Sequence, residues 1–181
     1  MFNGPAYWRV IHYCSINDNC RELLQQLGDF ISCEKCRSGY RPPTNDEDLQ
    51  LWSINFHNII NKQIGKDCSQ EFYIKSTCDI CTSEVPAYPW EFIHNVAEFA
   101  KDDAIEFLKT FNNTYPCNNC RGNLLMDDKN TDENCLFWTL RNRKQFCEKN
   151  TLPSFIYIMD PPVSDSNCIG CANQIIKEPV N

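Results

Sequence analysis

One set of residues occurs twice in the same order along this chain, and this internal repeat constrains the fold more than any other feature. Each copy has a proline, a tryptophan and histidine four residues apart, a Cys-x-x-Cys-Arg motif and a further tryptophan, with spacings that agree within two residues. The corresponding pairs are Pro5 and Pro86, Trp8 and Trp90, His12 and His94, Cys33 and Cys117, Cys36 and Cys120, and Trp52 and Trp138. The period is longer than that of solenoid repeats, so the pattern predicts tandem duplication of a small domain.

Both copies have the hydrophobic periodicity of α-helices. In the first copy, apolar residues recur with a 3.6-residue period through residues 23–31 and again on one face of residues 49–60. Thr44 and Glu47 form a capping-box signature ahead of the second of these helices, and Gly65 is placed to end it. These patterns predict helices rather than strands.

The second copy has helical patterning from Asp102 to Phe111, and the alternation typical of strands is scarce before residue 155. We therefore expect an all-α protein with four parts. They are a first bundle over residues 1–67, a connector with a Cys-x-x-Cys pair over 68–85, a second bundle over 86–150, and a tail with another such pair over 151–181.

The charge and hydropathy of the chain argue against two classes of partner. The formal net charge is −7 at pH 7 and Lys and Arg are scattered, which disfavours nucleic acid. The longest strongly apolar run, residues 155–159, is too short to span a bilayer. The first residues lack the basic and apolar regions of a signal peptide. We therefore expect no nucleic-acid or membrane partner and a cytoplasmic location, where stable disulfides are the exception.

Cysteine is the most over-represented residue, with thirteen in the chain. Eight of them form Cys-x-x-Cys pairs at 33/36, 78/81, 117/120 and 168/171, a spacing that suits redox motifs or metal sites. A thiol at the start of a helix has a lowered pKa and is both a nucleophile and a good leaving group. Structural disulfides and zinc ligands use the same spacing. The remaining cysteines, whose pairing the sequence does not set, are Cys14, Cys20, Cys68, Cys135 and Cys147.

The first Cys-x-x-Cys pair is flanked by side chains that could hold a flat, polar cofactor. Residues four apart share a helix face, which places Trp8 with His12 and His57 with Asn61. Taken singly, the tryptophan fits a core residue and the histidine a satisfied buried group, but together the residues favour a cofactor site. The candidate cofactor-binding residues are Trp8, His12, His57, Asn58, Asn61, Lys62 and Lys66.

Residues 4–66 resemble the catalytic bundle of the Erv/ALR flavin-dependent sulfhydryl oxidases, especially the compact viral members. The matching residues are Gly4-Pro5, Trp8, His12, Cys33-x-x-Cys36, Trp52, His57-Asn58-x-x-Asn61-Lys62 and Gly65-Lys66. The family often has His-x-His-Asn where this chain has Asn55 in the first position. The resemblance implies a four-helix bundle that binds FAD non-covalently, here tandemly duplicated with a degenerate second bundle.

The resemblance also implies a reaction and the residues that perform it. Cys36 would lie against the isoalloxazine ring, and Cys33 would be the exposed cysteine that exchanges with incoming dithiols. Electrons would pass from protein dithiols through the disulfide of this pair and FAD to molecular oxygen, giving a substrate disulfide and hydrogen peroxide. The viral members place the protein in the host cytoplasm or the virion.

The second copy is expected to bind no flavin. Aligning Trp138 with Trp52 puts Arg143 at the position of His57 and a lysine beside it, and these bulky cations would fill the cofactor space. We expect this copy to pack against the first in place of a homodimer partner, although dimerisation stays open. The alternative is that Cys117-x-x-Cys120 relays electrons to the first pair.

A mobile shuttle disulfide is expected at Cys168 and Cys171, in a polar stretch near the C-terminus, with Cys78 and Cys81 as the alternative. Two other classes of protein compete with the oxidase. Four Cys-x-x-Cys pairs could form a cytosolic zinc-binding interaction module. The chain could also be a helical scaffold with structural disulfides. Flavin absorbance or bound zinc would separate these hypotheses.

Overall fold

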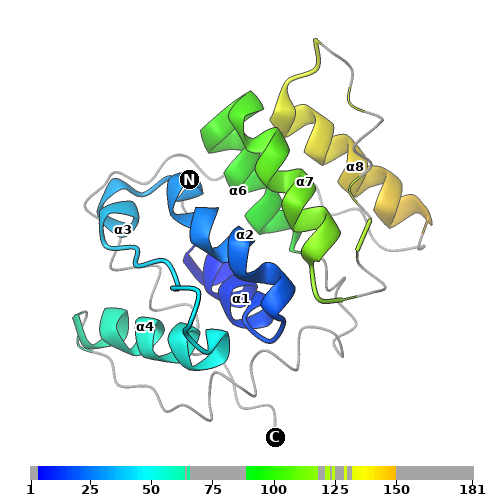
Figure 1. Cartoon of the computed structure of the whole chain (residues 1–181). Coiled ribbons are helices and arrows are strands. Elements are labelled where there is room, and N and C mark those ends of the chain that lie inside the picture. Colours follow the sequence, from blue (N-terminus) through cyan, green and yellow to red (C-terminus); the bar gives the residue numbers. More distant parts are fainter. Residues whose placement is uncertain are drawn as a thin grey trace, which may run out of the picture.

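The computed structural model of the chain describes residues 4–63, 65, 89–117, 121–122, 124, 129 and 132–149 (Figure 1). Every regular element in these residues is a helix, which confirms the all-α prediction. The connector over 68–85 and the tail over 151–181 lie outside the described residues, and so do Lys66 and the cysteines of both segments. None of the helices in the described part is long and apolar enough to cross a membrane.

Residues 4–63 of the first half contain four α-helices and two short 3-10 helices. Their bounds are α1 Gly4–Cys14, η1 Asp18–Cys20, α2 Arg21–Gln26, η2 Leu27–Phe30, α3 Glu34–Ser38 and α4 Leu49–Gln63. The predicted capping box is only half formed, because the Glu47 carboxylate accepts the Thr44 backbone N–H at 2.8 Å while α4 begins further on. Asp48 caps α4 instead, accepting the N–H of Leu51 at 2.8 Å. Gly65 follows this helix with a φ of 75°, in the left-handed region that glycine tolerates best.

The described elements of the second half follow a similar order, with first and last helices as long as those of the first half and a longer middle helix. Its elements are α6 Trp90–Ala100, η4 Lys101–Asp103, α7 Ala104–Thr114 and α8 Cys135–Lys149. Asp103 stands immediately before α7, close to the helix start expected from the two aspartates. Asn134 caps α8 as Asp48 caps α4, since its side chain accepts the backbone N–H of Leu136 at 2.9 Å.

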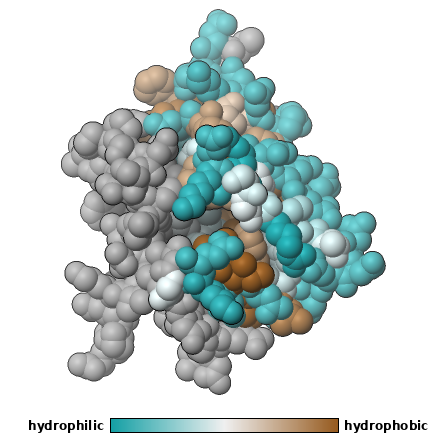
Figure 2. Space-filling view, turned by 90° about the vertical axis from the view of Figure 1, so that its left-hand side faces the viewer, coloured by the Kyte–Doolittle hydropathy of each residue, from teal (hydrophilic) through white to brown (hydrophobic). Residues whose placement is uncertain are grey.

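The two halves share one hydrophobic core. Two helices of the first half each pack against the corresponding helix of the second half. Helix α1 contacts α6 and α2 contacts α7, and within each half the first helix contacts the last (Figure 1). At these contacts Tyr7 meets Phe92 edge to face at 4.9 Å between ring centroids, and Phe30 stacks on Phe107 at 4.1 Å. In Figure 2 the described residues on this side are largely hydrophilic around a small hydrophobic area. The interface between the halves therefore lies inside the molecule, at the centre of its core.

Candidate functional site

Three of the predicted cofactor-binding residues lie together between α1 and α4. The indole of Trp8 stacks on the imidazole of His57, with 3.8 Å between centroids and planes 4° apart. His12 lies one turn beyond Trp8, and its Nε2 is 2.7 Å from Nδ1 of His57. The four-residue spacing on α1 puts both side chains on the face that α4 covers. Sequence positions far apart thus form one aromatic cluster.

Two serines that the sequence reasoning did not identify complete this cluster. His12 Nδ1 lies 3.2 Å from the Ser53 hydroxyl, and Ser53 lies 3.1 Å from the hydroxyl of Ser15. Ser15 also donates to the backbone carbonyl of His12 at 2.7 Å. Ser53 is one turn before His57, so its position on the same face was the available signal. Both ring nitrogens of His12 therefore have polar neighbours and the ring orientation is fixed.

The two histidines of the cluster are uncharged at neutral pH. Burial lowers the pKa of His12 to about 4. Burial, with the nearby His12 ring as a further cause, lowers the pKa of His57 to about 2. Since both rings are neutral, one ring nitrogen donates to the other across the 2.7 Å contact. The cluster presents flat, uncharged faces, which suit a planar ring system better than an anion.

The remaining predicted binding residues follow along α4. Asn61 is buried on the same side of the helix as His57, and Asn58 is half-buried beside it. The side-chain oxygen of Asn58 is buried and has no hydrogen-bond donor among the residues that the structure describes. Lys62 is exposed near the helix end. A buried amide oxygen without a donor and uncharged stacking faces fit the N–H groups and flat rings of FAD.

The first Cys-x-x-Cys pair begins helix α3, which lies on the same side of the molecule as α4 (Figure 1). Cys33 is the N-cap residue, and its sulfur accepts the backbone N–H of Cys36 at 3.3 Å. Cys33 is 9% exposed and Cys36 is half-buried. The expectation that Cys33 is the exposed member is therefore wrong for this structure, because its capping role turns its side chain inward.

The second half retains the tryptophan and histidine of the first helix, but its last helix has no histidine. Trp90 and His94 are buried on α6, with 6.0 Å between ring centroids. Phe146 lies 5.8 Å from Trp90, and Arg143 is close enough to act on the charge of His94. Burial first, and Arg143 second, lower the pKa of His94 to about 3. A cation thus lies near this histidine, as the alignment with His57 predicted.

The described residues give the zinc-binding alternative no support. Among them, no group of three or more His, Cys, Asp or Glu side chains is placed to hold a metal ion. Cys117 is half-buried, while its partner Cys120 lies outside the described residues, as do both cysteines of the connector pair and of the tail pair. The proposed relay and shuttle roles of these pairs are therefore untested.

Comparison with known proteins identifies similar chains in African swine fever virus. FAD-linked sulfhydryl oxidase of the Warthog/Namibia isolate is 33% identical over 81 residues, which cover 35% of this chain and 68% of the relative. The same enzyme of the Tick/Malawi isolate is 31% identical over 120 residues, which cover 56% of this chain and 92% of the relative. No family model and no solved structure matches the chain.

Proposed function

The chain belongs to the FAD-linked sulfhydryl oxidases, and from this membership we propose that it joins paired thiols of protein substrates into disulfides and reduces oxygen to hydrogen peroxide. The reaction balances as one dithiol and one oxygen molecule giving one disulfide and one hydrogen peroxide. Thiol oxidation with FAD is the activity that the relatives' name states. The described observation that most supports the proposal is the neutral stack of Trp8, His57 and His12.

In the proposed reaction a substrate thiolate attacks the Cys33–Cys36 disulfide and forms a mixed disulfide, which the second substrate thiol resolves. FAD, when bound, supplies the chemistry that carries two electrons from the dithiol to oxygen. Cys36 is assigned to the cofactor side and Cys33 to exchange with the substrate. Because Cys33 is only 9% exposed, attack on its sulfur requires the start of α3 to move outward and its contact with the Cys36 N–H to open.

The cofactor-binding residues have separate proposed tasks. Trp8 and His57 offer ring faces, and His12 holds the imidazole of His57 in place through the 2.7 Å contact. Asn58 and Asn61 supply amide groups toward the cofactor. Lys62 and Lys66, at and beyond the end of α4, are assigned to the pyrophosphate, which two cations would neutralise.

A set of variants tests the proposed function. The native protein should be yellow, with flavin absorbance, and should consume oxygen and produce peroxide when given a dithiol. Cys36→Ser should abolish oxygen consumption while FAD stays bound. His57→Ala should lose FAD, whereas the matched change His94→Ala in the second half should keep it. A colourless protein that cannot be reconstituted with FAD, or turnover by Cys36→Ser, would contradict the proposal.

The second half is proposed to act as a degenerate companion that replaces a homodimer partner. The two halves share local contacts as well as sequence: Arg37 donates to the carbonyl of Ile31 at 2.8 Å, and Arg121 donates to that of Tyr115 at 3.0 Å. In both cases the carbonyl is six residues before the arginine. A monomeric state in solution would support this role. Cys117→Ser tests the relay alternative, which requires slower oxidation of protein thiols in this variant.

The shuttle and the location are proposed from the family alone. Cys168 and Cys171 are assigned as the shuttle, so Cys171→Ala should slow oxidation of protein thiols more than that of small dithiols. Equal losses would remove this assignment. Because the relatives are viral proteins, the host cytoplasm or the virion is proposed as the location, and fractionation of infected cells and purified virions tests it.

A further inference from the structure

Cys14 and Cys20 meet inside the core where α1 turns into α2. Two successive backbone bonds reverse the chain between them, from Asn17 N–H to Cys14 O at 3.1 Å and from Cys20 N–H to Asn17 O at 2.9 Å. Both residues are 0% exposed in the core, and their thiols are close enough to act on each other's ionisation. Because the turn is local, this contact does not depend on a distant element. The sequence alone did not pair these cysteines.

We propose that Cys14 and Cys20 form a structural disulfide in the mature protein, separate from the redox pair Cys33–Cys36. The cross-link would join the last residue of α1 to the residue before α2. Its formation removes a thiol hydrogen bond from Cys20 to the Thr114 carbonyl, at 3.1 Å. A thiol is a weak donor, so this loss is small beside the constraint that the cross-link places on the unfolded chain.

The oxidising step rests on the proposed function and occurs before the core closes, because folding buries both sulfurs. In an incompletely folded chain, Cys14 and Cys20 reduce the Cys33–Cys36 disulfide of a second, folded copy by thiol–disulfide exchange. One sulfur–sulfur bond forms and one breaks, and two electrons with two protons pass to the second copy. That copy is reoxidised by oxygen in its own catalysed reaction, so no other oxidant is required.

Burial makes this cross-link persistent once it has formed. No external thiolate can reach a sulfur that is 0% exposed, whereas Cys36 is half-buried. The Cys14–Cys20 disulfide is therefore distinct in chemistry from the exchanging pair.

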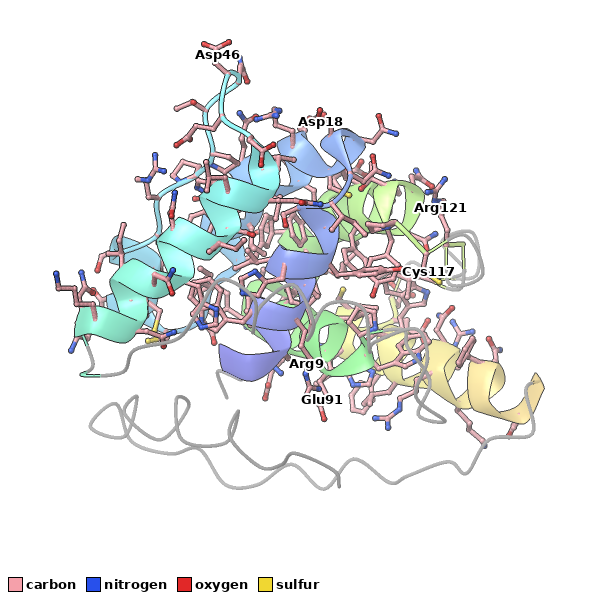
Figure 3. All side chains as sticks on the ribbon, turned by 90° about the horizontal axis from the view of Figure 1, so that it is seen from below. Arg9, Asp18, Asp46, Glu91, Cys117 and Arg121 are labelled. Atoms are coloured by element: carbon pink, nitrogen blue, oxygen red, sulfur yellow. The ribbon has the colours of Figure 1, made fainter. Side chains whose placement is uncertain are left out.

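The position of the cross-link connects it to the cofactor site and to the second half. Cys14 is two residues after His12 and precedes Ser15, which bonds the His12 carbonyl. On the other side, Cys20 contacts α7 through Thr114, and Arg121 is close enough to act on its charge. Figure 3 shows Arg121 together with Cys117 where the chain leaves α7. The disulfide would hold the histidine-bearing end of α1 against both neighbours.

Peptide mapping of the full-length holoenzyme tests the cross-link directly. A protease that cleaves before aspartate releases residues 1–17 and 18–28, which contain one cysteine each. The protein is denatured with N-ethylmaleimide and no reductant, then digested. A single species with the summed mass of the two peptides less two hydrogens is expected. Two separate, alkylated peptides would overturn the proposal.

Thermal unfolding of variants provides the second test. Cys14→Ala and Cys20→Ala should each lower the Tm by roughly 5–10 °C, because each opens the same loop. The double variant should be no less stable than the weaker single variant, since one bond is lost in every case. Cys135→Ala, another fully buried cysteine, is the control for lost packing and should cost less. Additive losses in the double variant would show that no bond joins the pair.

The Cys36→Ser protein, expressed alone, separates the cross-link from its oxidant. Unlinked peptides in this variant and linked peptides in the wild type would support oxidation by the enzyme's own activity. Linked peptides in both would refute that step and still support the disulfide. Neither outcome depends on the oxygen-consumption assay that tests the proposed function.

Discussion

All three histidines of this chain are buried, and we predict that this makes its stability depend steeply on pH. His12, His57 and His94 are 4%, 3% and 1% exposed, and the sequence contains no other histidine. Burial is the main cause that lowers their pKa values, to about 4, about 2 and about 3. In the unfolded chain each would titrate near about 6.5. The folded protein therefore keeps three neutral rings over a range where the unfolded chain is charged.

The magnitude follows from proton linkage. At about pH 5.5 an unfolded histidine binds roughly 0.9 proton while the folded one binds almost none, so unfolding takes up nearly three protons. The free energy of unfolding should then fall by roughly 3.7 kcal/mol for each pH unit in this region. A histidine whose pKa is lowered by folding contributes stability that is present when the pH is above its pKa in the unfolded chain. This contribution is lost as the pH falls below that pKa. The loss should begin near about pH 7 and steepen toward about pH 5.5.

Urea titrations between about pH 5 and 6, at a constant excess of FAD, measure this slope. Replacing one histidine by glutamine, in His12→Gln or His94→Gln, should lower the slope by about one third, since one proton no longer binds on unfolding. The two variants probe the cofactor half and the companion half separately. A wild-type slope below about 1.4 kcal/mol per pH unit, the value for one proton, would refute the neutral, buried arrangement.

Three further predictions rest on single contacts. Trp8→Ala removes the ring stacked on His57 and should weaken FAD binding roughly tenfold or more in a fluorescence titration. Trp90→Ala, the matched control, should leave the affinity for FAD unchanged. Equal effects of the two variants would contradict the proposed site. Ser53→Ala removes the hydroxyl beside His12 and should lower the free energy of unfolding by about 1 kcal/mol in urea titrations, and no loss would exclude that bond. Phe99→Ala removes the ring 5.3 Å from the Arg37 guanidinium and should cost about 0.5–1 kcal/mol, whereas Phe99→Tyr keeps the ring and should be neutral.

The class of fold and the shared helix face of Trp8 and His12 could be predicted because both depend on local spacing, whereas the contact of His12 with His57 joins positions 45 residues apart. A 3.6-residue period identifies helices, and four-residue spacing put Trp8 with His12 on one face. The helix starts were less certain, since they depend on competition between neighbouring side chains. Glu47 bonds the Thr44 N–H as a capping box requires, yet Asp48 lies next to α4 and caps it. Because Glu47 and Asp48 are adjacent and both acidic, the sequence pattern could not show which of them bonds the first turn of the helix.

The burial of the cysteines depends on the tertiary structure and their pairing on the shape of a turn, so neither could be predicted from their spacing. Cys33 was expected to be exposed, but the side chain of an N-cap residue turns back toward its own helix, and here it meets the Cys36 N–H. The contact of Cys14 with Cys20 depends on the turn through Asn17, whose side chain caps η1 by accepting the backbone N–H of Asn19 at 3.0 Å. Spacing alone favoured the Cys-x-x-Cys pairs, so the six-residue separation of these two cysteines carried no signal.

The two halves share a framework of contacts around the first and last helix of each half and differ at one position of the last helix. In both halves a tryptophan and a histidine on the first helix face the last helix. Ser53 on α4 corresponds to Thr139 on α8, and each hydroxyl donates to the backbone carbonyl three residues earlier. One turn further along, His57 contributes a neutral ring, but Arg143 contributes a cation that lowers the pKa of His94. Arg143 is half-buried, and a flat cofactor binding beside it would have to remove water from its permanent charge, which costs free energy. We therefore predict that the second half binds no flavin without any change of fold, because a single difference on its last helix places a cation where the first half has His57.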